Sequence, residues 1–102
     1  MNQKNSTNLL NYQSLAKAAE CLKALAHPHR LQIIQLLLEG ELYTVMEIKQ
    51  KFGLTQSSTS EHLRFLQRCG FLKSSKSGRS VYYEISEPHL QDIVNCMRSR
   101  FG

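Results

Sequence analysis

The spacing of the apolar residues changes at Gly70, and this change constrains the fold more than any other feature of the chain. Before Gly70 the apolar residues recur at three- and four-residue steps, which is the pattern of amphipathic helices. After Gly70 they alternate with polar residues over Phe71–Lys76 and Arg79–Ile85, as in half-buried strands. We therefore predict a helical region followed by a two-stranded hairpin that turns at Ser77 and Gly78.

Start and stop signals divide the region before Gly70 into four helices. Thr44-Val45-Met46-Glu47 matches a capping box, in which the hydroxyl and the carboxylate each satisfy a free backbone N–H group. Ser86 is expected to cap a last helix after the hairpin, with Glu87 and Pro88 in its first turn. The first four helices are expected to start near Tyr12, Pro28, Thr44 and Thr55, and the last three of these to stop at Gly40, Gly53 and Gly70.

This order of parts predicts a mainly α fold with a small β-hairpin, arranged as a winged helix-turn-helix with four helices, two strands and a C-terminal helix. A chain of 102 residues is short for two domains, so we expect one domain over residues 12–102 behind a flexible tail at residues 1–11. That tail does not resemble a secretory signal. The longest apolar run, Leu36–Leu38, is far below the roughly 18 residues that span a membrane.

The net charge of +5 favours an anionic partner, either nucleic acid or an anionic membrane surface. The three cysteines, Cys21, Cys69 and Cys96, are widely spaced and form no C-x-x-C pair. This spacing is typical of a reducing compartment rather than of a disulfide framework or a zinc finger. We therefore expect a cytoplasmic protein.

The fourth helix has one polar face, and a cationic segment follows it. On a helical wheel, Thr59, Leu63 and Leu66 fall opposite a face of hydroxyl and guanidinium groups. The segment between His62 and Tyr83 holds five cationic residues and no acidic one, as expected of phosphate contact. Each feature alone also fits a solvated helix face or a protected sheet edge. Together they predict double-stranded DNA as the partner, with candidate contacts at Gln56, Ser57, Ser58, Ser60, His62, Arg64, Arg68, Lys76 and Arg79.

Three segments carry a family resemblance: residues 25–31 (LAHPHRL), residues 54–63 (LTQSSTSEHL) and residues 78–83 (GRSVYY). In this order and spacing the chain resembles the ArsR/SmtB family of prokaryotic transcriptional regulators. The resemblance implies a homodimer built on the first and last helices, which binds an inverted repeat and represses a nearby promoter until a signal releases it. The alternative is a winged-helix module whose basic face docks an acidic protein.

Members of that family often sense metals, and the residues at the corresponding positions here do not complete a site. Thr44 and Met46 stand where one type of site has two thiolates. Glu87 and His89 match half of a second type, but Arg100 occupies a position of the other half. We therefore expect no metal and no cofactor.

A third type of site in the family senses oxidants through two cysteines, and Gln35 stands at the first of these positions. Cys21 and Cys96 remain as possible thiol sensors, since the first and last helices are expected to pack together at the dimer interface. Cys69 is interpreted as an ordinary small buried thiol. The sequence contains no Gly-rich phosphate loop and no nucleophile beside a base, so we do not expect an enzyme.

Overall fold

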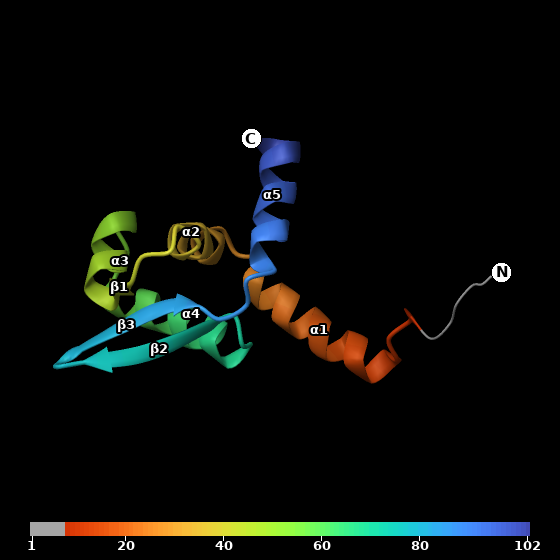
Figure 1. Cartoon of the computed structure of the whole chain (residues 1–102), viewed down its shortest axis with the longest axis horizontal. Coiled ribbons are helices and arrows are strands. Elements are labelled where there is room, and N and C mark those ends of the chain that lie inside the picture. Colours follow the sequence, from red (N-terminus) through yellow and green to blue (C-terminus); the bar gives the residue numbers. More distant parts are fainter. Residues whose placement is uncertain (1–7) are drawn as a thin grey trace.

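The computed structural model describes residues 8–102 (Figure 1), so most of the expected tail at residues 1–11 lies outside the described part. The order of elements is that of a winged helix-turn-helix, which confirms the predicted fold class. Among residues 8–102, no helix is both long and apolar enough to cross a membrane. The elements are α1 (Tyr12–Leu25), α2 (Pro28–Leu37), β1 (Tyr43–Thr44), α3 (Val45–Phe52), α4 (Gln56–Arg68), β2 (Leu72–Ser77), β3 (Ser80–Ile85) and α5 (Leu90–Phe101).

Helices α1 and α3 begin at side-chain caps, of which the sequence predicts the one at α3. The Asn11 side chain accepts a hydrogen bond from the backbone N–H of Ser14, and α1 follows. At α3 the predicted capping box is complete: Thr44 Oγ1 accepts from Glu47 N at 3.2 Å, and Glu47 Oε1 accepts from Thr44 N at 2.9 Å. These bonds satisfy N–H groups that lack a partner within the helix.

The sheet has three antiparallel strands in the order β1-β3-β2, so the prediction of two strands was wrong. The predicted hairpin is present as β2 and β3, with Leu72 opposite Ile85. The additional strand β1 pairs Tyr43 with Tyr83. Two residues are too few to show an alternating pattern, and their partners lie about forty positions later in the chain, so no local signal marks β1.

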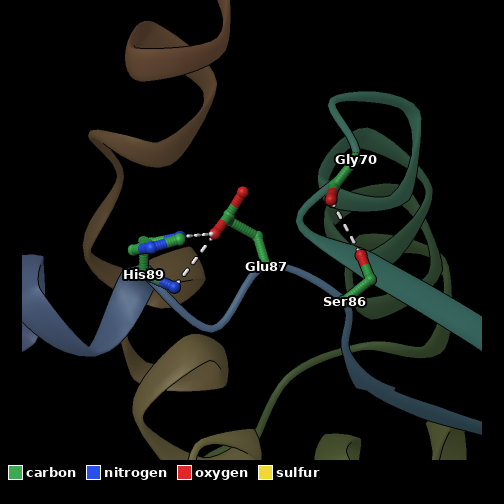
Figure 2. Close-up of polar contacts among 4 residues, drawn as sticks. All are labelled: Gly70, Ser86, Glu87 and His89. Atoms are coloured by element: carbon green, nitrogen blue, oxygen red, sulfur yellow. Dashed lines mark hydrogen bonds and ion pairs between the residues drawn. The ribbon is translucent and has the colours of Figure 1, made fainter.

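The residues before α5 also differ from the prediction, because Ser86 does not cap that helix. Its Oγ donates instead to the carbonyl oxygen of Gly70 at 2.8 Å (Figure 2). The helix starts at Leu90, and Glu87 and His89 lie in a turn that precedes it. The Ser86 hydroxyl thus joins the end of β3 to the residue that follows α4.

One hydrophobic core joins the end of α1, through Leu25, to α2, α3, α4, β2 and α5. On α2, α4 and α5 its buried members recur at helical spacing, as the sequence pattern predicts, and α3 contributes Ile48. Tyr83 and Ile85 pack against this core from β3, whereas Val81 on the same face is exposed farther along the wing. The largest fully buried side chains are Ile33, Ile34, Leu37, Ile48, Leu63, Leu66, Leu90, Val94 and Thr59.

Helix α1 projects away from this core (Figure 1). Of its 14 residues only Ala24 and Leu25, at its end, are buried. The radius of gyration is 16.0 Å, against about 13 Å for a compact domain of about 100 residues. Most of the surface of α1 therefore has no cover from the rest of residues 8–102.

Candidate nucleic-acid interface

Helices α3 and α4 form a helix-turn-helix around a short turn. Gly53 ends α3 in the left-handed region, with φ at 65°, a conformation that glycine adopts at little cost. Thr55 then caps α4, because its Oγ1 accepts from Ser58 N at 3.1 Å. The turn contains only Gly53, Leu54 and Thr55, so the start of α4 is held close to the end of α3.

Helix α4 buries one face and exposes the other, as its sequence predicts. Thr59, Leu63 and Leu66 are fully buried. The Thr59 hydroxyl donates to the carbonyl oxygen of Thr55 at 2.7 Å and so leaves no unpaired polar hydrogen in the core. Ser58 and Ser60 are half-buried at the edge between the faces. The exposed face carries Gln56, Ser57, Glu61, Arg64 and Arg68.

His62 lies on the buried side of α4, although it was a candidate DNA contact. Its side chain is only 6% exposed. Arg30 Nε donates to His62 Nδ1 at 3.0 Å, so a neutral ring carries its proton on Nε2, which lies 3.3 Å from Ser58 Oγ. Both ring nitrogens are thus engaged inside the protein, and His62 is placed to hold α4 rather than to meet a base.

The surroundings of His62 disfavour its charged form. Burial of the ring and the adjacent Arg30 guanidinium lower the pKa of His62 below its ordinary value. The imidazoles of His27 and His29, with ring centroids 4.8 and 6.0 Å from that of His62, act in the same direction. The neutral ring keeps Nδ1 available as the acceptor for Arg30.

Arg30 connects three elements, and it was not among the residues that the sequence singled out for function. Its Nη1 donates to the carbonyl oxygen of Ala24 in α1 at 2.8 Å, while Nε reaches His62 in α4. The guanidinium also lies 4.4 Å from the ring centroid of Phe65. Because Arg30 belongs to α2, its side chain holds α1, α2 and α4 together.

The β2–β3 hairpin forms a wing beside α4. Gly78, with φ at 62°, and Arg79 form the turn at its tip, one residue later than the sequence predicts, because Ser77 still belongs to β2. The side chains of Lys76, in β2, and of Arg79 are exposed. Gln67 Nε2 in α4 donates to Ser74 Oγ in β2 at 3.2 Å. This bond connects the wing directly to the helix whose polar face is exposed.

The cations of α4 and the wing have no acidic partner within residues 8–102. The ion pairs in this part of the chain join Lys23 to Glu20 and His89 to Glu87, all outside α4 and the wing. Unpaired, exposed cations on neighbouring elements give a positive surface that attracts phosphate groups. The cationic side chains of this surface are Arg64, Arg68, Lys73, Lys76 and Arg79.

Glu87 and His89, the incomplete metal half-site of the sequence, bind each other (Figure 2). Glu87 Oε2 accepts from the backbone N–H of His89 at 2.9 Å and from its Nδ1 at 2.7 Å. The backbone hydrogen bond, followed by the side-chain one, lowers the pKa of Glu87. In residues 8–102 no three His, Cys, Asp or Glu side chains form a group suited to a metal ion. This pair stabilises the turn before α5.

Cys21 and Cys96, the possible thiol sensors of the sequence, and Cys69 are all free thiols. Cys69 is the C-terminal cap residue of α4 and, like Cys21 in α1, is half-buried. Cys96 is exposed on α5. Burial, followed by the contact with Cys21, raises the pKa of Cys69 to about 11.

The sequence is similar to those of known bacterial regulatory proteins. The sequence model described as "Bacterial regulatory protein, arsR family" matches residues 27–74, which include α2, α3 and α4. The transcriptional activator HlyU of Vibrio cholerae is 37% identical over 82 residues, 80% of this chain and 75% of the relative. The transcriptional repressor PagR of Bacillus anthracis is 36% identical over 88 residues, 86% of this chain and 88% of the relative.

Solved structures show the same fold. NolR from Sinorhizobium fredii superimposes with a TM-score of 0.82 at 26% identity, covering 100% of this chain and 98% of that one. HlyU from Vibrio cholerae gives a TM-score of 0.76 at 31% identity, covering 89% and 98% of the two chains. Mb0332 from Mycobacterium bovis, described as a homodimeric winged helix-turn-helix DNA-binding domain, gives a TM-score of 0.76 at 25% identity over 97% and 88%. This chain is therefore a winged helix-turn-helix transcriptional regulator and belongs to the ArsR family of bacterial regulatory proteins.

Proposed function

We propose that this chain is a homodimeric repressor that binds an inverted-repeat operator in double-stranded DNA. The observation that carries the proposal is the surface formed by the exposed face of α4 and the neighbouring wing. This surface carries hydroxyl, amide and guanidinium groups, and its cations have no acidic partner in residues 8–102. Such a surface has the donors that read bases and the charge that binds phosphates.

The residues of this surface divide into two roles. Gln56, Ser57, Ser60 and Arg64 lie on or beside the exposed face of α4, and we assign them to the major groove. The exposed cations Arg68, Lys76 and Arg79 are assigned to backbone phosphates, which fix register without reading sequence. Ser58 and His62 are positioning residues, because their side chains contact each other and, through His62, Arg30.

Helices α1 and α5 supply the proposed dimer interface. On α1, Tyr12, Leu15 and Leu22 are 83%, 50% and 53% exposed, and on α5 Phe101 is 81% exposed. Apolar side chains at this exposure, on a helix that projects from the core, gain stability when a second copy covers them. A two-fold dimer would present two copies of α4 to the two half-sites of an inverted repeat.

Repression is the direction of regulation that we favour. PagR is named as a repressor and HlyU as an activator, so the family resemblance alone does not fix the direction. The described residues form one small winged-helix domain, and such a domain bound over a promoter blocks access to it. A protein of this kind acts most simply by occupying a promoter.

The test measures binding of the full chain to duplexes selected from a random library, over a series of salt concentrations. Counterion release requires the affinity to fall steeply with salt, and Arg64→Ala is expected to weaken binding and relax the selected sequence. The control is Arg98→Ala, an exposed arginine on α5, which lies apart from the wing (Figure 1), compared at protein concentrations at which both variants are dimeric. Absence of DNA binding at low salt would instead support a basic face that docks an acidic protein.

A further inference from the structure

His62 belongs to a cluster of three imidazoles at the junction of α2 and α4. Its ring centroid lies 4.8 Å from that of His27 and 6.0 Å from that of His29, and these two are 5.6 Å apart. His27 is the N-terminal cap residue of α2, and His29 lies in the first turn of that helix. The cluster therefore lies between α2 and the buried side of α4, the proposed recognition helix.

Two rings of this cluster accept a hydrogen bond on Nδ1. His62 Nδ1 accepts from Arg30 Nε at 3.0 Å, and His27 Nδ1 accepts from the backbone N–H of His29 at 3.2 Å. A neutral imidazole accepts through its unprotonated nitrogen, whereas the charged ring carries a proton on both nitrogens and only donates. A proton on either Nδ1 therefore replaces a hydrogen bond with two donors that face each other.

Protonation of His62 also places a second positive charge against Arg30. The guanidinium cannot turn away freely, because its Nη1 donates to the carbonyl oxygen of Ala24 in α1 at 2.8 Å. The guanidinium also lies 4.4 Å from the ring centroid of Phe65. Since the His62 ring is buried, little water screens the repulsion between the two charges. The charges separate most readily by a displacement of α4 from α2.

The charged and titratable groups that face His62 come from both helices of this junction. Arg30, His27 and His29 belong to α2 and its cap, and each of them disfavours the charged ring of His62. Glu61 on α4 favours the charged ring, but this carboxylate is exposed and its effect is the smallest of the four. Burial and these neighbours lower the pKa of His62, so the ring is neutral at neutral pH and gains its proton below about pH 6.5.

We propose that the hydrogen bond between Arg30 and His62 is a pH-sensitive switch: protonation of His62 in mild acid breaks the bond, and the displacement of α4 that follows weakens operator binding. The effect on operator binding rests on the DNA-binding function proposed above. The loss of the hydrogen bond concerns only the chain itself and stands independently of that function.

The position of the switch explains its effect on DNA binding. Arg30 joins α4 to α1, the helix that projects toward the proposed dimer partner. The two recognition helices of a dimer must lie about one turn of DNA apart. A change in the angle between α1 and α4 alters that separation in both protomers at once.

The sign of the pH dependence distinguishes this switch from a direct phosphate contact. An imidazole beside a phosphate group is stabilised in its charged form, so acid strengthens such binding and the binding takes up protons. In the proposed switch the DNA-bound protein requires the neutral ring of His62. Operator binding therefore releases protons, and by linkage the affinity falls in acid.

NMR spectroscopy of the isotope-labelled full chain without DNA tests the switch itself. Between about pH 7.5 and about pH 5.0, we expect the His62 ring signals and the Arg30 Nε–H signal to change with one shared midpoint below about pH 6.5. In His62→Asn, whose side-chain oxygen can accept from Arg30 without gaining a proton, the Arg30 signal should stay constant. An Arg30 signal that does not follow the titration of His62 would overturn the proposal.

Operator binding at fixed salt tests the effect on DNA. From about pH 7.5 to about pH 5.0 the affinity of the wild type should fall at least about tenfold, a typical size for coupling between two sites. Calorimetry in two buffers of different ionisation enthalpy should show that binding at about pH 6 releases protons. His62→Asn should lose most of this pH dependence. The control His89→Gln should keep it, since His89 is an exposed imidazole outside the cluster.

Three results would refute the effect on DNA: an affinity that is constant or rises in acid, proton uptake on binding, or a pH dependence that His62→Asn retains. The calorimetric measurement uses the wild type, so it decides the matter even if His62→Asn folds poorly. If the wild type bound no DNA at any pH, the proposed function would fail, while the NMR result would still stand.

Discussion

Replacing Arg30 with alanine removes the side chain that holds α4 against α1 and α2. The hydrogen bonds to Ala24 O and His62 Nδ1 are both lost, and these acceptors, on two buried residues, remain without this donor. Hydrogen bonds from a charged donor contribute about 1.5–3 kcal/mol each, and a partly exposed cation–π contact about 0.5–1 kcal/mol. Since contributions of one side chain are not additive, we expect a loss of about 2–4 kcal/mol.

Urea unfolding at one fixed protein concentration measures this loss, because the stability of a dimer depends on concentration. Arg79→Ala is the matched control, since Arg79 is an exposed arginine for which the structure shows no hydrogen bond or ion pair within residues 8–102. A double-mutant cycle of Arg30→Ala with His62→Ala should show coupling above about 0.5 kcal/mol. If Arg30→Ala unfolds within about 0.5 kcal/mol of the wild type, as surface substitutions do, this account of Arg30 is wrong.

Four further outcomes follow from the described contacts. Arg79→Ala should keep the wild-type unfolding midpoint but lower the salt slope of DNA binding by about 1, and an unchanged slope would remove Arg79 from the phosphate contacts. Thr44→Ala breaks the capping box and should cost about 1 kcal/mol in urea unfolding, with Thr44→Ser retaining most of the stability. Folding lowers the pKa of His62, so the unfolded chain takes up the proton first as the pH falls. The contribution of His62 to the free energy of unfolding should therefore be complete above about pH 6.5 and decline below it. A pH profile of unfolding that His62→Gln leaves unchanged would contradict this. Leu22→Glu places a charge on the exposed face of α1 and should give monomers in light scattering, whereas a dimer of wild-type affinity would place the interface elsewhere.

The features that the sequence predicted are those that neighbouring residues encode. The capping box of Thr44 and Glu47 lies within one helical turn, and the change of period at Gly70 is visible within ten residues on either side. The burial of Thr59, Leu63 and Leu66 follows from the period of one helix. Such signals need no knowledge of what packs against the segment.

The features that the sequence did not predict depend on distant pairs. On a wheel, His62 stands beside the buried face of α4, but its burial is settled by Arg30, which lies 32 positions earlier. The bond from Arg30 to the carbonyl oxygen of Ala24 depends in the same way on how α1 meets α2. Strand β1 exists only because β3 offers it a partner. No local sequence pattern predicts contacts such as these, whose partners are brought together only by the fold.

The projection of α1 links the folding of this helix to the assembly of the protein. A helix of 14 residues is marginal in water by itself, and here only its last turn is buried. In the proposed dimer, the free energy that orders the rest of α1 must come from the second chain, so association and helix formation form one coupled equilibrium. The occupancy of a promoter would then rise more steeply with protein concentration than it would for a preassembled dimer. A modest fall in the concentration of the protein would therefore free the promoter.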